Sequence, residues 1–302
     1  MAKEKRAKTD FLEENLPQTR KEQFFDLLKN QYKVIFFVGL MLLLLFIPDL
    51  VKNALKDVMN DKIHIALEEA VITQEQATSG TFVTWLISSA IDLVLYPIVF
   101  TGILGLLRVI RQMIYGEPVV FKYDFSIGFK ENFKSGLLLG FLVGLAKFVF
   151  DLVIVSFASS AVVKTLAYVI FLLILLPMFI VCAFYSVIYK NRIGRSLGHS
   201  FLLYLKGSWR ILLVMVVGIV PFIVLEFFLH FPIKQLIYAV LILFLLPLVL
   251  LAGFMVMNFV FDEAINIGQY PSLYRKGLYI SKEEQKQLLE KQQIIEEVYE
   301  KN

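Results

Sequence analysis

The sequence predicts an all-α fold, a polytopic membrane helix bundle of six spans that form three repeated hairpins. Hydrophobic residues make up 58% of the chain and its mean hydropathy is +0.71, whereas a soluble domain is nearer half apolar. Several uncharged runs approach or exceed the ~20 residues that a helix needs to cross a bilayer. A short motif also occurs three times, each time directly before an apolar run, which indicates an internal repeat.

The motif joins aromatic and apolar residues at four-residue spacing to two basic residues. On a helix the rings share one face and the cations take the other. Such an amphipathic helix is expected to lie in the membrane surface before each hairpin, with its cations towards the anionic headgroups of the lipid bilayer. Chance is the alternative, but three copies in register favour a repeat. The copies are Phe24, Leu28, Lys29, Tyr32 and Lys33; Phe125, Phe129, Lys130, Phe133 and Lys134; and Phe201, Leu205, Lys206, Trp209 and Arg210.

The charge pattern divides the chain into a membrane domain and two tails. Residues 1–22 are charged and are expected to form a cytoplasmic tail, and residues 23–262 are expected to form the six-span domain. Residues 263–302 are expected to form a second cytoplasmic tail, with a helix over 281–302 that opens with a capping box, Ser-x-x-Glu.

The six spans follow from the apolar runs. Lys33 and Lys52 are expected to reach opposite interfaces and so to complete the short first span. An outer excursion over 52–80 is expected to hold one or two short amphipathic helices and a turn at 78–80. The expected spans are about 34–51, 81–107, 135–157, 165–189, 211–229 and 235–261.

The basic residues predict the orientation. The loops 115–134 and 190–210 are rich in Lys and Arg, the turns 158–164 and 230–234 are nearly uncharged, and 52–80 carries more acid than base. The positive-inside rule then puts both termini and both basic loops in the cytoplasm, an N-in/C-in arrangement. The net charge of +4 is therefore interpreted as a membrane-surface bias and not as a nucleic-acid footprint.

Prolines and glycines predict how the spans pack. The returning helix of each hairpin carries a proline, which bends a span and supports the repeat; these are Pro97, Pro177 and Pro247. Small residues at four-residue spacing let a second helix approach closely. Such a stripe in the third span is expected to pack inside the bundle and not to form a dimer; it consists of Gly136, Gly140 and Gly144.

Three acids mark the far ends of the outward-going helices. Asp49, Asp151 and Glu226 follow the motif lysines by 20, 21 and 20 residues. At ~1.5 Å per residue they lie roughly 30 Å away, which is the thickness of the hydrocarbon core. They therefore form either a ring of carboxylates in an outward-facing vestibule that attracts a cation or a polyhydroxyl ligand, or helix ends that water solvates.

Two further charges lie inside spans, where ionisable residues are costly and often functional. Lys147 precedes Asp151 by four residues, so the two share a helix face and are expected to form a structural pair. Asp92 is the most isolated acid and follows Ser88 and Ser89, whose hydroxyls are candidate hydrogen-bond donors. Asp92 is therefore the first residue to mutate in a test of function. The alternative interpretation is that it is an acid in the outer leaflet, without a functional role.

The sequence lacks the usual signatures of catalysis and of cofactor binding. It contains no Walker A motif, no dinucleotide loop, no HExxH and no GxSxG. Its one cysteine lies in an apolar run, and His64, His199 and His230 do not have the spacing of metal ligands. We therefore expect no catalytic site, no metal and no cofactor.

The stretch from Pro97 to Gly144 resembles the signature region of the YesL-like family of bacterial membrane proteins. The similar features are a proline in a span, Arg108 and Arg111 at a helix end, Gly116-Glu117 and the second motif copy; the third copy is similar to that family's second cytoplasmic loop. The resemblance covers most of residues 20–262, and the excursion and the charged tails depart from it. It implies an integral plasma-membrane protein, often encoded beside carbohydrate uptake systems, and it implies no catalytic residues.

Three functional hypotheses follow. The first is a non-enzymatic protein that assists a carbohydrate uptake system and docks to transporter subunits through its basic cytoplasmic loops, with Arg192, Arg195 and Lys206, and through its C-terminal helix. The second is a small-solute transporter in its own right, because repeats, bent helices and membrane acids suit one. The third is a membrane enzyme that acts on lipid or envelope intermediates, which would have to use the membrane acids alone.

Overall fold

The computed structural model describes residues 16–157, 160–189, 193–228, 233–281, 283–284, 286–287 and 289–290, with the backbone alone at 226–228. The described residues form helices and turns and contain no strand. Six segments are long and apolar enough to cross a membrane. The chain is thus an all-helical, multi-pass membrane protein, as predicted.

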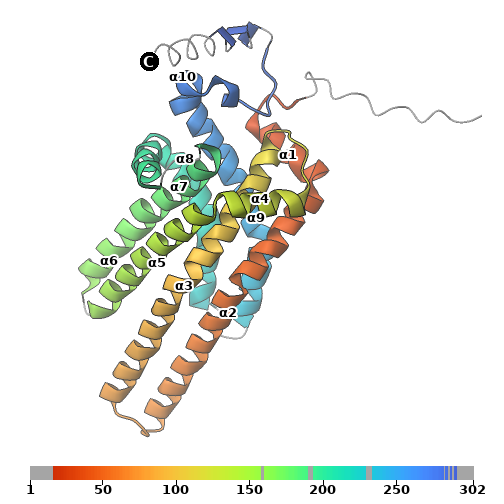
Figure 1. Ribbon diagram of the computed structural model, residues 1–302. Coiled ribbons are helices and arrows are strands. Elements are labelled where there is room, and N and C mark those ends of the chain that lie inside the picture. The colour runs from red at the N-terminus through yellow and green to blue at the C-terminus, as the bar shows by residue number, and fades with distance from the viewer. Residues whose placement is uncertain are drawn as a thin grey trace, which may run out of the picture.

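Long helices build the bundle, and shorter ones lie at one end of it (Figure 1). The long helices are α2 (Tyr32–Glu68), α3 (Gln74–Ile114), α5 (Phe133–Ser156), α7 (Leu176–Tyr189), α8 (Ile193–Phe228) and α9 (Ile233–Phe261). A π-helical turn, η2 (Phe171–Leu175), joins α6 (Ala161–Ile170) to α7 into one span. The short elements are α1 (Arg20–Asn30), α4 (Phe121–Glu131), η3 (Asp262–Asn266), α10 (Ile267–Gln269) and η4 (Pro271–Leu273).

The short helices and the turn predicted within the 52–80 excursion are wrong, because this stretch is the tip of a long hairpin. Helix α2 continues without a break to Glu68, and α3 begins at Gln74. The turn lies at 69–73, and 78–80 is helical. A capping box starts α3, because Thr73 and Gln76 hydrogen-bond each other's backbone N–H, at 3.3 and 2.9 Å. The α2–α3 hairpin reaches well beyond the α5–α6 hairpin (Figure 1).

The glycine stripe of α5 packs against α3, as the sequence predicts. A Cβ at Gly140 would lie 2.4 Å from the Tyr96 carbonyl oxygen and 2.6 Å from Pro97 Cα, and a Cβ at Gly136 would lie 2.5 Å from Thr101 Cα. Thr101 also donates a hydrogen bond of 2.7 Å to the carbonyl of Pro97. Close backbone contact therefore covers the proline bend inside the bundle.

The first two motif copies each straddle a helix break, and the third does not. Gln31 separates α1 from α2, and Asn132 separates α4 from α5. The third copy, 201–210, lies within the continuous helix α8. In all three copies the last aromatic residue is exposed: Tyr32 by 60%, Phe133 by 44% and Trp209 by 65%.

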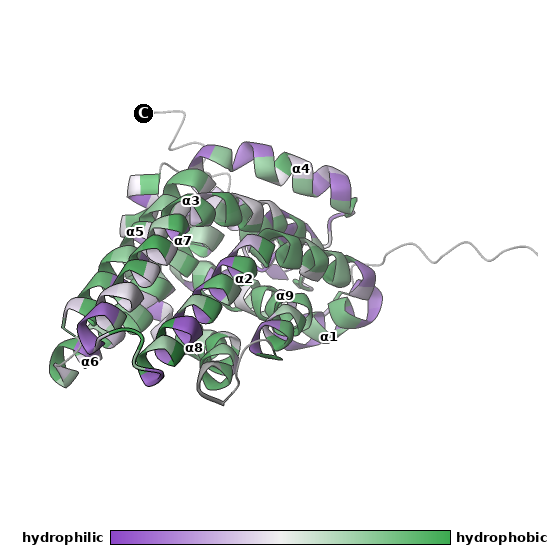
Figure 2. Cartoon of the chain, turned by 90° about the horizontal axis from the view of Figure 1, so that it is seen from below, coloured by the Kyte–Doolittle hydropathy of each residue, from purple (hydrophilic) through white to green (hydrophobic). Residues whose placement is uncertain are grey.

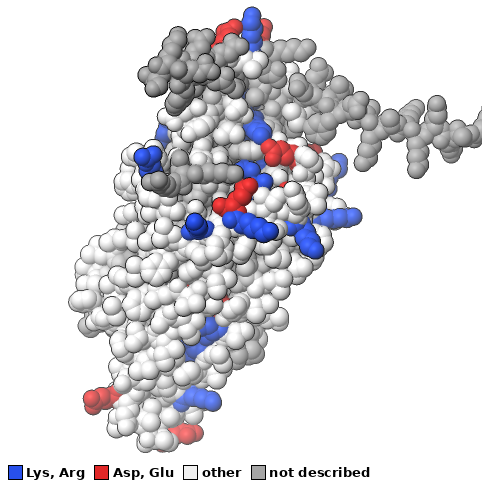
Figure 3. Space-filling model, viewed as in Figure 1, with Lys and Arg blue, Asp and Glu red and all other residues white. Residues whose placement is uncertain are grey.

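The two ends of the bundle differ. We call the end with α1, α4 and residues 262–281 the terminal end, and the end with the 69–73 turn and the α5–α6 turn the hairpin end. Hydrophobic residues cover most of the long helices, while hydrophilic residues stand out on α1 and α4 (Figure 2). On the face in Figure 3, Lys and Arg gather towards the terminal end, and a mostly uncharged zone separates them from charges near the hairpin tip.

Residues 262–281 fold back onto the terminal end. The Gln23 side-chain amide donates to the carbonyls of Ile114 and Gly277, at 2.7 and 2.9 Å. Gly277 has a φ of 84°, and a Cβ there would lie 1.9 Å from the Ile114 carbonyl oxygen, so the turn requires glycine. At the start of the helix predicted over 281–302, Glu284 N–H donates to Ser281 Oγ at 3.3 Å. Residues 291–302 of that helix lie outside the described range.

Candidate functional site

A chain of five charged side chains links three helices inside the bundle. Asp92 of α3 is 1% exposed and accepts from Lys52 of α2. Lys52 Nζ also lies 2.8 Å from Asp49 Oδ1. On the other side, Lys147 Nζ of α5 lies 3.0 Å from Asp92 Oδ2 and 2.5 Å from Asp151 Oδ2. The order is thus Asp49, Lys52, Asp92, Lys147, Asp151.

Helical spacing aligns these groups on the faces that meet. Asp49 and Lys52 are one turn apart on α2, and Lys147 and Asp151 are one turn apart on α5. Neutral polar groups complete the network: Ser89 donates to Asp151 Oδ2, and Asn53 donates to Asp49 Oδ2, both at 3.0 Å. Every buried charge therefore has an opposite charge or a hydrogen-bond donor beside it, which is what a low-dielectric environment demands.

The charge chain borders a polar cavity of about 240 Å³ between α2, α3, α5 and α9. A second ion pair forms part of another wall of the cavity, because Lys234 Nζ lies 2.8 Å from Asp57 Oδ2. Since one water takes up ~30 Å³ of liquid, the cavity has room for several waters or for one small polar group. Carboxylates, lysines, serine hydroxyls and aromatic rings line it, among them Trp85, Tyr96 and Tyr238.

On the terminal-end side of the cavity residues, the same four helices carry buried apolar residues. These are Leu42, Val99, Val143 and Ile242, each at most 5% exposed. Deeper still, α2 and α9 cross in close contact, because a Cβ at Gly39 would lie 2.0 Å from the Leu243 carbonyl oxygen. The cavity residues thus lie on the hairpin-end side of these buried contacts.

The structure confirms some predicted site residues and corrects others. The Lys147–Asp151 pair is confirmed. Asp92 is not isolated, because two lysines contact it, and Ser89 donates to Asp151 instead. Lys52 does not reach the interface; it is 9% exposed and turns inward, since α2 continues past it. Asp49 and Asp151 do meet around one cavity, while the side chain of Glu226 lies outside the description.

Sequence reasoning missed Lys56, Asp57 and Lys234 as members of this site. A signal for the first two was present, because Asp49, Lys52, Asn53, Lys56 and Asp57 recur at helical spacing. The prediction of short helices over 52–80, separate from the first span, hid it. Lys234 has no such signal, because only the packing of α9 against α2 brings it to Asp57.

The motif lysines and arginine have two kinds of environment at the terminal end. Lys206 Nζ donates to the Glu263 carbonyl at 3.0 Å, and Arg210 lies 3.4 Å from the Glu263 carboxylate. The other motif lysines are exposed and have no ion pair within the described ranges; they are Lys29, Lys33, Lys130 and Lys134. The third copy is therefore held by the chain itself, whereas the first two present free cations.

A buried pair holds the returning segment at the same end. The Arg20 guanidinium lies 3.3 Å from Asp262 Oδ2 and donates to the carbonyl of Lys276 at 3.1 Å. Burial lowers the pKa of Arg20, and the neighbouring Asp262 opposes that shift. Burial also raises the pKa of Tyr115. These groups fasten residues 262–281 and supply no reactive group.

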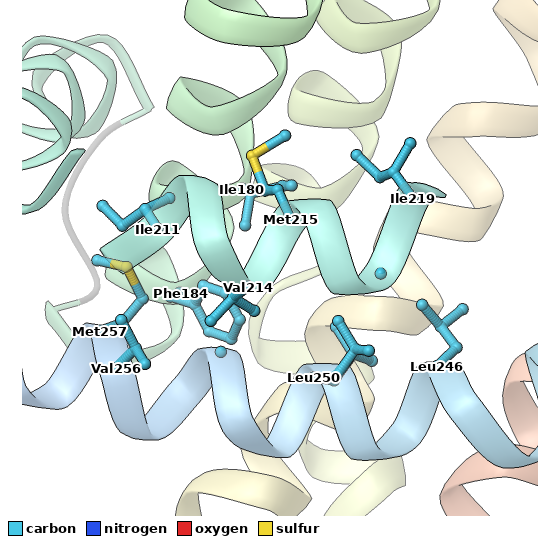
Figure 4. Close-up of a pocket in the computed structure, with 13 residues that line it drawn as sticks. Ile180, Phe184, Ile211, Val214, Met215, Ile219, Leu246, Leu250, Val256 and Met257 are labelled. Carbon is cyan, nitrogen blue, oxygen red and sulfur yellow. The ribbon is translucent and has the colours of Figure 1, made fainter. Parts of the chain in front are cut away.

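A second cavity lies between α7, α8 and α9 and has a different character (Figure 4). Its volume is about 140 Å³, and its walls are apolar side chains such as Phe184, Val214 and Met215. It offers neither a hydrogen bond nor a charge to a ligand. No cluster of metal-ligating side chains occurs among the described residues.

The polar cavity has the chemistry of a binding site. It combines four lysines and three aspartates on its walls, with Asp92 behind them, so it presents both donors and acceptors to a polar group. Its lining includes no cysteine or histidine. Comparison of the chain with protein-family models, with curated proteins and with solved structures finds no match.

Proposed function

We propose that this chain is a non-enzymatic integral membrane protein of the bacterial plasma membrane that assists a solute uptake system. Carbohydrate is the solute class that the resemblance to the YesL-like family implies. One observation supports the accessory role above all: buried Leu42, Val99, Val143 and Ile242 lie on the terminal-end side of the polar cavity, on the same four helices. A group bound in the cavity would have to pass these apolar residues to cross the bundle.

The charge distribution supports an orientation with the terminal end in the cytoplasm. Exposed cations without an ion pair in the described part of the chain gather at that end, on α1, α4 and the start of α8; they include Lys29, Lys130 and Arg195. The positive-inside rule assigns such an end to the cytoplasm. The cavity would then lie at the depth of the outer leaflet and open to the outside.

The same cations support docking to an acidic surface of transporter subunits. Arg195 is exposed on the first turn of α8, and neighbouring Gly194 and Gly198 have open space where a Cβ would point. Lys206 is a weaker candidate than the sequence suggested, because it already donates to the Glu263 carbonyl. Anionic lipid headgroups would compete for the motif cations, so Arg195 is the more specific probe of docking.

A small-solute transporter is the second candidate. Buried ion pairs inside spans, such as Lys52–Asp92, are typical of pathways that open alternately to the two sides. This candidate requires the apolar layer around Leu42 and Val143 to part during the cycle.

Purification from native membranes in a lipid-preserving polymer, followed by mass spectrometry, tests the proposal. We expect transporter subunits at near-stoichiometric amounts, and we expect Arg195→Glu to reduce them several-fold. Lys62→Glu is the matched control, because Lys62 is exposed at the opposite end of the molecule.

Proteoliposomes that contain this chain alone separate the two candidates. Under the accessory proposal they take up no radiolabelled sugar. If the chain alone takes up sugar and Asp92→Asn abolishes this uptake, the accessory role is overturned and the transporter is favoured.

A further inference from the structure

Lys56 is the lysine of the polar cavity that lacks a carboxylate partner. Lys52, Lys147 and Lys234 each lie within 3.0 Å of a carboxylate oxygen. Lys56 is half-buried and has no ion pair within the described ranges. A half-buried ammonium group without a counter-ion is a place where an anionic group of a ligand binds favourably.

An apolar groove meets the cavity at Lys56. The groove has a volume of about 450 Å³ and lies between α2 and α3. Lys52, Lys56 and Ser88 line both the groove and the cavity. The rest of the groove is mainly apolar, with Val51, Leu55, Met59, Ile87 and Ile91 each at least 41% exposed. A polar chamber and a lipid-facing groove thus share one border.

The groove continues along α2 on the side of Lys56 where an acyl chain would lie. From Lys56 to Pro48 it follows α2 over eight residues, about 12 Å at ~1.5 Å per residue. Lys56 and Trp85 both line the polar cavity, and both also line a further groove that Ser156, the last residue of α5, borders. Trp side chains favour the membrane interface. A headgroup at Lys56 would therefore lie at the interface, with an acyl chain running towards Pro48.

The charge balance identifies the headgroup. The chain Asp49, Lys52, Asp92, Lys147, Asp151 has three carboxylates and two ammonium groups, a net charge of −1. Among the described residues, the Asp57–Lys234 pair is neutral, and Lys56 adds +1. The cavity thus offers one free cation at its border and an excess carboxylate within. A zwitterion matches both, whereas a purely anionic headgroup meets the excess carboxylate.

We propose that the cavity and the α2–α3 groove together bind a zwitterionic phospholipid with a primary amine. Its phosphate accepts from Lys56 and from the Ser88 hydroxyl. Its ammonium group donates to the carboxylates of Asp49 and Asp151, which line the cavity at the two ends of the charge chain. One acyl chain lies against Leu55, Ile87 and Ile91. A quaternary ammonium has no N–H to donate to these carboxylates, so phosphatidylethanolamine binds better than phosphatidylcholine.

Native mass spectrometry of the full chain tests the proposal. The delipidated protein is given equal amounts of phosphatidylethanolamine, phosphatidylglycerol and phosphatidylcholine with identical acyl chains. We expect phosphatidylethanolamine to be retained most. Lys56→Ala should lower its retention about tenfold, as expected for the loss of one charge-assisted hydrogen bond. Lys62→Ala, on the same helix but outside the cavity, should change nothing.

Two further experiments have outcomes that would overturn the proposal. Ile87→Trp fills the groove without touching the charges, so it should also reduce lipid retention. If soluble phosphoethanolamine competes as well as the lipid and Ile87→Trp has no effect, the ligand is a soluble zwitterion and the lipid assignment fails. Equal retention of all three lipids, or retention that Lys56→Ala leaves unchanged, overturns the headgroup assignment.

The inference deepens the proposed function, because it rests on the same cavity being a binding site and names its ligand. The two fail separately. Transporter subunits that co-purify with a protein unable to select phosphatidylethanolamine would leave the accessory role standing and overturn the lipid site. A protein that selects this lipid but purifies without transporter subunits would support the lipid site and overturn the accessory role.

Discussion

Two halves of the bundle solve the problem of packing in lipid in different ways. Around α2, α3 and α5, buried ion pairs and close backbone contacts join the helices, as at Asp92 and Gly140. Around α7, α8 and α9, apolar side chains surround a pocket of about 140 Å³. Helix association in lipid depends on packing and on polar contacts. The packing of the polar half therefore depends on a few specific residues, whereas the apolar half leaves unfilled space between its side chains.

Loss of the central acid should have the largest effect. Asp92→Ala removes the carboxylate that Lys52 and Lys147 share, and breaking a buried pair typically costs 3–5 kcal/mol. We expect a loss of about 3 kcal/mol in the free energy of unfolding, measured by reversible unfolding in bicelles. Asp61→Ala, at an exposed position of α2, is the control. An Asp92→Ala protein as stable as the wild type would refute the idea that the ion pairs join this half.

Paired glycine substitutions test the comparison directly. Gly140→Ala places a Cβ against the backbone of Tyr96 and Pro97, which cannot yield without separating α3 from α5. We expect a loss of about 1–3 kcal/mol. In the apolar half, a Cβ at Gly253 would lie 3.3 Å from the end of the Phe184 ring, beside a pocket. Gly253→Ala should change stability by about 0.5 kcal/mol or less, and equal losses would remove the distinction between the halves.

The outer acid of the charge chain should matter less than the central one. Asp49→Asn removes one ion pair of Lys52, but the Lys52–Asp92 contact remains and the new amide still accepts a hydrogen bond. We expect a loss of about 1 kcal/mol in the same unfolding measurement. A loss as large as that of Asp92→Ala would mean that the five groups act as one inseparable network.

Filling the apolar pocket should have the smallest effect and the opposite sign. Val214 lines the pocket (Figure 4), and Val214→Leu adds one methylene group to it. We expect a gain of about 0.5 kcal/mol, because new dispersion contacts replace empty space. A marked loss would indicate that the pocket is too tightly packed to accept the group.

Local sequence patterns predicted contacts within one helix and between neighbouring helices. Four-residue spacing correctly predicted the Lys147–Asp151 pair and the packing of Gly136 and Gly140 inside the bundle. The short helices and the turn predicted over 52–80 were wrong because the charged residues beyond Val51 were interpreted as following the end of the first helix, although α2 continues to Glu68. The Thr73–Gln76 capping box was the available signal that α3 begins at Gln74, earlier than the predicted start of the second span at 81.

The sequence by itself determined the class of this protein, because length and hydropathy decide whether a helix spans a bilayer, and six segments do. It also determined which residues share a helix face. Only the tertiary structure decided that Lys52 turns inward to Asp92 and that Lys234 meets Asp57. The physical reason is that a buried charge takes whichever partner the packed helices bring within reach, and the distance between helices far apart in the chain has no period in the sequence.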